Sequence, residues 1–209
     1  MNILIADDHS VVRRGLKTIL VDAFPNATIE EASDGIELLN KALEQDWSII
    51  VSDISMPGKT GIEVVKELKE LKPKQKVLIL SVHAAEQYAV RTLKAGAAGY
   101  LTKESAPEEL VKAIEHIMGG RKYITPEIAE ILVNINIDNS GSRQPHEALS
   151  DREFEVLKLI ASGKTVSEIA DILSLSIHTI STYRSRILEK MQMKNNAELT
   201  KYAISNSLA

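Results

Sequence analysis

Three carboxylates stand directly after two short apolar segments that the sequence predicts as strands. Asp7 and Asp8 follow residues 3–6. Asp53 follows residues 49–52. In a doubly wound parallel sheet, the carboxyl ends of the strands line the ligand crevice where the strand order reverses. Carboxylates gathered there repel one another, which favours a hard divalent cation such as Mg²⁺. One of them can then act as a nucleophile toward a phosphoryl group whose charge the metal neutralises.

Two further polar residues stand at the ends of other apolar segments. Ser81 ends residues 77–81 and offers a hydroxyl donor. Lys103 follows residues 99–102 and offers a compact positive charge suited to phosphate. Each of the five residues alone has an ordinary alternative as a turn, cap or solvated residue. Their joint placement at four strand ends of one sheet predicts a phosphoryl-transfer site.

The pattern of residues 1–119 predicts the sheet that would position these side chains. Short apolar segments at 3–6, 28–32, 49–52, 77–81 and 99–102 alternate with amphipathic segments near 10–23, 35–45, 61–72, 86–95 and 107–118. Regular alternation of this kind predicts parallel strands with helices on both faces. We therefore expect an α/β domain with a doubly wound five-stranded parallel sheet in the flavodoxin-like order 2-1-3-4-5.

The signal for strands ends after Gly120. Pro126 opens a predicted helix to about residue 136, and residues 137–146 are polar and rich in helix breakers, as in a linker. The chain is expected to contain a domain at 1–119, a short helix and flexible linker at 120–147, and a second domain at 148–209.

The second domain is predicted to be small and all-α. Ser150 with Glu153, and Thr165 with Glu168, have the spacing of capping boxes, and Gly163 stands where the first helix should stop. A longer helix capped by Ser176 is expected to run to about residue 192, and a last helix from residues 195–196 to about 205. A short helix, a tight turn and a longer helix form the helix-turn-helix arrangement, whose second helix enters the DNA major groove.

Positive charge is concentrated on the longer helix. The whole chain has a formal net charge of −4, but residues 176–201 hold five basic and two acidic residues. The apolar residues expected to face inward are Ile177, Ile180, Ile187, Leu188 and Met191. The polar side chains left for the outside, of types that bond phosphates and base edges, are His178, Ser181, Thr182, Arg184, Ser185 and Arg186.

Composition narrows the class of protein further. The 209-residue chain has no cysteine, which excludes disulfides and thiolate metal sites and fits a reducing cytoplasm. No apolar run approaches the roughly 18 residues of a membrane span, and the first residues do not form a secretion signal. We expect a cytoplasmic protein with no membrane partner.

Residues 1–119 resemble the receiver domain of two-component response regulators. The resemblance is carried by residues 5–9 (IADDH), 51–61 (VSDISMPGKTG), 80–81 (LS) and 100–103 (YLTK). It implies that a sensor histidine kinase phosphorylates Asp53, and that Asp8, Asp53 and the backbone carbonyl of Ser55 bind Mg²⁺. It also implies that Asp7 acts through water or an outer contact, that Ser81 and Tyr100 form a switch pair, and that Lys103 binds the phosphate.

The second domain resembles the LuxR-type DNA-binding domain. The matching segments are residues 149–163, 168–170 and 179–191, and the combination of domains is similar to the NarL/FixJ class of response regulators. The DNA-contact residues expected from the helix and from this resemblance are His178, Thr179, Ser181, Thr182, Arg184, Ser185, Arg186, Lys190 and Lys194. Ser181 stands where many members of the family have lysine. The phosphorylated form would associate as a homodimer, or release its DNA-binding helices, and bind a promoter with two related half-sites.

Two alternatives to a transcription regulator stay open. The same acids could serve a Mg²⁺-dependent phosphatase or phosphotransferase, although such enzymes usually have a second acid two residues after the nucleophile, where this chain has Ser55. The helical domain could instead bind protein, which would make the chain a signalling adaptor. We favour a regulator that is not an enzyme.

Overall fold

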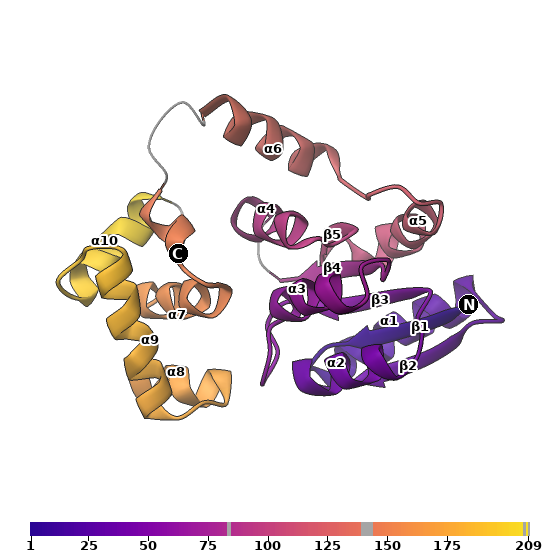
Figure 1. Ribbon diagram of the computed structural model, residues 1–209, viewed down its shortest axis with the longest axis horizontal. Helices are drawn as coiled ribbons and strands as arrows, with labels where there is room; N and C mark the ends of the chain where they lie inside the picture. The colour runs from indigo at the N-terminus through magenta and orange to yellow at the C-terminus, as the bar shows by residue number, and fades with distance from the viewer. Residues whose placement is uncertain (83–84, 139–143, 207, 209) are drawn as a thin grey trace. The chain divides into compact units, whose positions relative to one another are not determined.

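The chain forms two compact units, Met1–Ile137 and Asp138–Ala209, each of which is described by itself (Figure 1). The computed structural model describes residues 1–82, 85–138, 144–206 and 208. Part of the predicted linker, residues 139–143, lies outside the described residues.

The first unit alternates strands and helices in the predicted order. Its strands are β1 (Asn2–Ala6), β2 (Thr28–Ala32), β3 (Ile49–Asp53), β4 (Val77–Ser81) and β5 (Gly99–Thr102). Its helices are α1 (Ser10–Ala23), α2 (Gly35–Glu44), α3 (Gly61–Leu71), α4 (Ala85–Ala95), α5 (Ala106–Met118) and α6 (Pro126–Asp138), whose last residue lies past the division between the units.

The five strands form one parallel sheet in the order β2-β1-β3-β4-β5, which confirms the predicted topology. Consecutive residues of the central strands, such as Ile3, Leu4 and Ile5 in β1, are fully buried, so helices cover both faces of the sheet. The cluster of buried residues on one face joins the strands to Leu16 and Leu20 of α1 and Leu110 of α5. Because β1 and β3 are neighbours, Asp7 and Asp53 come to the same edge of the sheet.

Residues after α5 also contact the first unit. Tyr123 forms a parallel bridge with Gly99, and its backbone N–H donates to Ala98 O at 2.8 Å. A Cβ atom at residue 99 would lie 3.0 Å from Tyr123 O, so glycine allows this close approach. The contacts also group most of α6 with the first unit. The boundaries at 119 and 147 stay a prediction.

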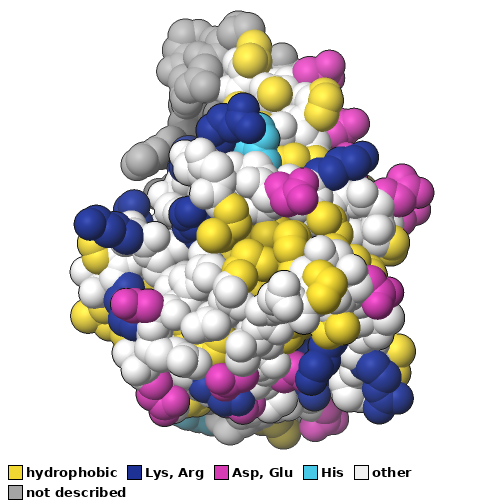
Figure 2. Space-filling view, turned by 90° about the vertical axis from the view of Figure 1, so that its right-hand side faces the viewer, with side chains coloured by type: hydrophobic (Ala, Val, Ile, Leu, Met, Phe, Trp, Pro, Cys, Tyr) yellow, Lys and Arg dark blue, Asp and Glu magenta, His cyan; other side chains and the backbone are white. Residues whose placement is uncertain are grey.

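The surface carries charged and apolar side chains together. On the face drawn in Figure 2, a group of hydrophobic side chains lies among Lys, Arg, Asp and Glu side chains of both signs. Several large hydrophobic residues of the first unit are exposed, including Val11 and Val21 of α1 and Ile124 after α5. Exposed apolar residues of this kind are ordinary in folded proteins and do not by themselves mark a binding site.

The second unit is helical, as predicted. Its elements are a short 3₁₀ helix η1 (Pro145–Ala148) and the helices α7 (Asp151–Ala161), α8 (Val166–Leu173), α9 (Ile177–Lys190) and α10 (Asn196–Ser205). Ser150 and Thr165 begin α7 and α8 with the predicted capping boxes, and Ser176 caps α9 by accepting from Thr179 N–H. Between α8 and α9, Ser174 adopts a left-handed conformation with φ of 53°, which turns the chain into α9.

One residue of the predicted inward stripe of α9 is misplaced. Ile180, Ile187 and Met191 are buried as expected and Leu188 is half-buried, but Ile177 is 56% exposed. Ile177 is the first residue of α9, and Ile180, about one turn later, is the first buried residue of the helix. Periodicity identifies the buried face of a helix but not where along the helix the packing begins.

The core of the second unit should depend on Phe154. This α7 side chain is 1% exposed, and α7 packs against both α9 and α10. Phe154→Ala is expected to cost roughly 3–5 kcal/mol, because the cavity would lie where three helices meet. Chemical denaturation followed by helical circular dichroism would measure this loss, with the conservative Phe154→Leu as a milder comparison. A loss below about 1 kcal/mol in the alanine variant would contradict this packing.

Candidate functional site

Asp7, Asp53 and Lys103 form a buried ion-paired group at the carboxyl edge of the sheet. Lys103 Nζ lies 2.6 Å from Asp7 Oδ2 and 2.7 Å from Asp53 Oδ2. The two carboxylates are 1% and 4% exposed, and the lysine side chain is 13% exposed. Lys103 is positioned by its own backbone N–H, which donates to Ser81 O at 2.7 Å. Three of the five residues predicted for phosphoryl transfer are thus in contact.

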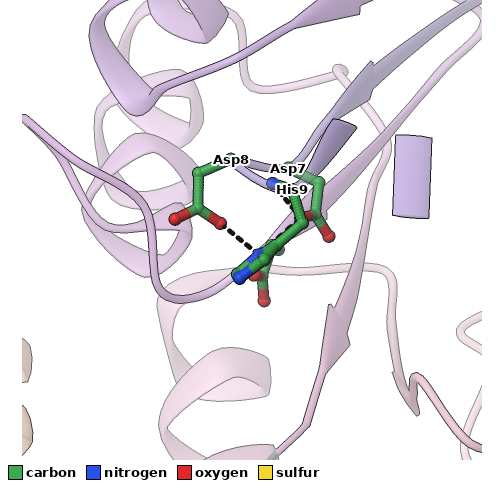
Figure 3. Close-up of side chains that lie close together, drawn as sticks. Asp7, Asp8 and His9 are labelled. Atoms are coloured by element: carbon green, nitrogen blue, oxygen red, sulfur yellow. Dashed lines mark hydrogen bonds and ion pairs between the residues drawn. The ribbon is translucent and has the colours of Figure 1, made fainter. Parts of the chain in front are cut away.

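Asp8 and His9 complete the group on its more exposed side (Figure 3). His9 Nδ1 lies 2.7 Å from Asp8 Oδ1 and 3.3 Å from Asp7 Oδ1. One ligand atom from each of Asp7, Asp8, His9 and Asp53 lies within 4.8 Å of the others. Oxygen-rich sets of this size suit a hard divalent cation, so these carboxylates fit the predicted Mg²⁺. His9 was not among the predicted site residues, because a single histidine after two acids carries no distinctive spacing.

Burial makes the ionised form of Asp53 costly. Burial, with a smaller contribution from the Asp7 charge, raises the pKa of Asp53 from 3.8 to about 6, although Lys103 and the Ile54 N–H oppose the shift. Burial lowers the pKa of Lys103, but the carboxylates of Asp53 and Asp7 outweigh this effect and raise it overall. Asp53 is therefore an ionised but poorly solvated carboxylate at neutral pH, which suits a nucleophile.

The loop after β3 holds Asp53 by several bonds. Ile54 N–H donates to Asp53 Oδ1 at 2.7 Å, and Gly61 N–H donates to Ile54 O at 2.8 Å. Thr60 then begins α3 with a capping box to Glu63. Ser55, whose carbonyl is a predicted metal ligand, lies in this loop and is half-buried.

Gly61 is expected to be essential for this arrangement. A Cβ atom at residue 61 would lie 2.0 Å from Asp53 O, so alanine must displace the backbone that carries the nucleophile. Gly61→Ala should cost roughly 1–3 kcal/mol in unfolding free energy, as expected for overpacking. Gly15→Ala is the matched control, because nothing lies within 4 Å of its added methyl group and alanine favours the helix. Thermal denaturation of both variants tests this, and equal stability of Gly61→Ala and wild type would contradict it.

The two predicted switch residues are both inside the fold. Ser81 at the end of β4 and Tyr100 in β5 are each 0% exposed. Tyr100 therefore has an inward pose in this structure.

The predicted DNA-contact residues of α9 fall into two groups. His178, Ser181, Ser185 and Arg186 are exposed, as are Lys190 and Lys194 near the end of the helix. Thr179, Thr182 and Arg184 are only partly exposed. Within the exposed group, residues 178, 181 and 185 recur at the three- to four-residue spacing of one helix face.

Several of these side chains already have partners within the unit. Arg184 Nε donates to Asn196 Oδ1 at 2.6 Å, and Lys190 Nζ lies 2.6 Å from Glu153 Oε2. Thr182 and Ser185 hydroxyls donate to backbone carbonyls one turn earlier. In the part of the chain that the structure describes, no hydrogen bond or ion pair engages the side chains of Ser181 and Arg186.

Family comparisons agree with both units. Residues 3–115 match the response regulator receiver domain, and residues 147–203 match the bacterial regulatory proteins of the luxR family. The chain belongs to the LuxR-family response regulators. It is therefore a DNA-binding regulator of a two-component system, with a receiver domain and a helix-turn-helix domain in one chain.

Individual relatives cover the whole response regulator. Oxygen regulatory protein NreC of Staphylococcus carnosus (strain TM300) is 35% identical over 214 residues, which cover 100% of this chain and 99% of NreC. RcsB of Salmonella enterica serovar Typhimurium, solved bound to promoter rprA in the presence of phosphomimetic BeF3⁻, matches with a TM-score of 0.63 and 29% identity over 97% of both chains. A structure of two RcsB dimers bound to two parallel DNAs matches with a TM-score of 0.59 and 30% identity over 98% of both chains.

Among the described residues, no helix combines the length and the apolar character that crossing a membrane would require.

Proposed function

We propose that Asp53 of this response regulator accepts a phosphoryl group from a sensor histidine kinase and thereby controls promoter binding. One Asp53 carboxylate oxygen forms a bond to phosphorus while the phosphorus–nitrogen bond of the donor histidine breaks, and the imidazole leaves. The observation that carries this proposal is the meeting of Asp7, Asp53 and Lys103 at one strand edge, at 2.6 and 2.7 Å.

Each neighbour of Asp53 has a proposed task. Lys103 stays close to Asp53 and neutralises charge on the phosphoryl oxygens. Asp8, Asp53 and the Ser55 carbonyl would hold Mg²⁺, and Asp7 would act through water or its contact with Lys103. When bound, Mg²⁺ supplies positive charge that offsets the repulsion between the carboxylates and the incoming phosphoryl group.

The proposed readout starts at Ser81. Its hydroxyl would donate to the phosphoryl group, and this bond would hold Tyr100 in the inward pose that it has in this structure. The surface near β5 would change, and two chains would associate as a homodimer. Dimerisation is supported by the likeness to an RcsB structure that contains dimers on DNA.

The DNA site is proposed to contain two related half-sites, each bound by one recognition helix α9. We propose that the exposed His178, Ser181, Ser185 and Arg186 face the groove, together with Thr179 and Thr182. Lys190 and Lys194 would hold phosphates, and Arg184 would position α10 through Asn196 as well as approach DNA. The functional boundaries proposed are a receiver at 1–119, a linker at 120–147 and a DNA-binding domain at 148–209.

The regulator is proposed to act in the cytoplasm and not as an enzyme with a small-molecule substrate. Ser55 stands two residues after Asp53, in place of the second acid that a phosphatase of this type uses. Absence of turnover on a small phosphate ester would support this assignment, and multiple turnover would contradict it.

Intact-mass measurement tests the proposed phosphorylation. Wild type and Asp53→Asn are incubated with acetyl phosphate and Mg²⁺. We expect one phosphoryl adduct on wild type and none on the variant, since the amide is a poor nucleophile. An adduct on both chains, or on neither, would contradict Asp53 as the acceptor of this donor.

A further inference from the structure

Arg13 contacts the backbone of residues 7–9, here called the acidic loop. The proposed phosphorylation mechanism gives Arg13 no role. Its side chain lies in α1 and is only 16% exposed. Nη1 donates to the backbone carbonyl oxygen of Asp7 at 2.6 Å. Charge-assisted hydrogen bonds of this length are among the stronger ones in proteins. Within the described structure, no hydrogen bond or ion pair joins Arg13 to the carboxylates predicted to bind Mg²⁺, so its bond to the acidic loop acts through the backbone.

The guanidinium is held in place by a neighbouring strand. Arg13 Nε lies 3.3 Å from Glu31 Oε2, and Lys17 Nζ lies 2.9 Å from Glu31 Oε1. Glu31 belongs to β2 and pairs with Ile5 of β1. Ile5 is the last residue but one of β1, and Asp7 directly follows the strand. A planar guanidinium can bond the carboxylate and the carbonyl at once, which a lysine ammonium on a flexible stem does less well.

The bonded carbonyl is well placed to orient both acids. The carbonyl of Asp7 belongs to the same planar peptide unit as the nitrogen and Cα atoms of Asp8. Fixing that plane therefore helps to fix the direction in which the Asp8 side chain leaves the backbone. Asp8 needs such support, because its side chain is 31% exposed and its only ion-pair contact in the described chain is with the His9 side chain, which is 68% exposed.

We propose that Arg13 is a positioning residue that sets the Mg²⁺ affinity of the receiver by holding the Asp7–Asp8 peptide. This inference rests on the proposed function, since it assumes that Asp8 binds the cation. Loss of a partner that orients a metal ligand typically weakens metal binding by roughly 10- to 100-fold. The chemical step itself should be spared, because no hydrogen bond or ion pair joins Arg13 to Asp53 or Lys103 in the described structure.

The test compares Mg²⁺ binding in wild type, Arg13→Ala and Lys17→Ala by isothermal titration calorimetry. Lys17→Ala is the matched control, because Lys17 shares Glu31 with Arg13 but does not bond to the acidic loop. We expect the Kd for Mg²⁺ to rise roughly 10- to 100-fold in Arg13→Ala only. The rate of phosphorylation by acetyl phosphate at saturating Mg²⁺ should stay within about twofold of wild type. Such a result would show that the variant binds the cation more weakly but carries out the chemical step normally.

A second variant tests the inference if Arg13→Ala fails to fold. If Arg13→Ala melts far below wild type, Glu31→Gln removes the charge that anchors the guanidinium while leaving Arg13 in place, and we expect a smaller rise in the Mg²⁺ Kd. An unchanged Kd in a folded Arg13→Ala chain, or an equal rise in Lys17→Ala, would overturn the inference. A wild-type chain that binds no Mg²⁺ would contradict the proposed metal site and the role of Arg13 together.

Discussion

Asp53→Asn is expected to make the Mg²⁺-free protein more stable than wild type at neutral pH. Burial raises the pKa of Asp53 from 3.8 to about 6, so the folded state disfavours its ionised form. Such a shift corresponds to roughly 2–3 kcal/mol of stability that wild type lacks at pH values above both pKa values. Asparagine carries no charge, and its side-chain oxygen can still accept from Ile54 N–H.

The pH dependence of this difference follows from the direction of the shift. A raised carboxyl pKa means that the folded state binds the proton more tightly than the unfolded state. Wild type therefore loses stability relative to the variant as pH rises from about 4 through 6. The gain in melting temperature should be full at pH 7.5 and smaller at pH 5.

Mg²⁺ above roughly 100 times its Kd should reverse the order of stability of the two chains. A cation that binds only the folded wild type stabilises it by mass action, and the variant lacks one of the proposed ligands. Differential scanning calorimetry at pH 7.5 and pH 5, each with and without Mg²⁺, measures both effects. A variant less stable than wild type without Mg²⁺ would show that the Lys103 ion pair outweighs the cost of burying the Asp53 charge.

Arg186→Ala is expected to lower DNA affinity by roughly 10- to 100-fold. Arg186 is exposed on α9, and no hydrogen bond or ion pair within the described chain competes for its guanidinium. The slope of log affinity against log salt should become less steep by about one for each protomer engaged, because one positive charge at the DNA and the counterion release that it causes are lost. Fluorescence anisotropy from about 50 to 200 mM salt, with a duplex selected from a random pool, gives both numbers.

Lys201→Ala provides the control for charge alone. Lys201 is also an exposed cation of the second unit, but it lies on α10 outside the predicted DNA-contact set. It should leave the affinity near wild type. Equal losses in the two variants would show that the whole unit attracts DNA by net charge and that α9 is not the recognition helix.

The acidic edge of the sheet was predictable because each acid directly follows an apolar run. Where a strand ends is encoded locally, and parallel strands bring their carboxyl ends to one edge. Asp7, Asp53 and Lys103 could therefore be placed together from their positions along the chain alone. The first residues of the helices were also predictable from the sequence, because a capping box such as Ser150 with Glu153 is a local pattern.

Tertiary contacts made by a single pair of residues left no comparable pattern in the sequence. The Tyr123 bridge to Gly99 involves a single residue pair, too short to show strand periodicity. Arg13 donates to Asp7 O, but in the sequence Arg13 is indistinguishable from any other basic residue of an amphipathic helix. Ile177 shows the reverse error, because its spacing fits the buried stripe but its place at the start of α9 leaves it exposed.

Phosphorylation-dependent DNA binding is the most direct test of a receiver coupled to a recognition helix. The affinity of the full chain for its selected duplex is measured with Mg²⁺, before and after acetyl phosphate, for wild type and Asp53→Asn. We expect at least roughly tenfold tighter binding by phosphorylated wild type, within the usual range of allosteric coupling, and no change in the variant. Equal affinity of the phosphorylated and unphosphorylated wild type, with the adduct verified by mass, would contradict control of DNA binding by Asp53.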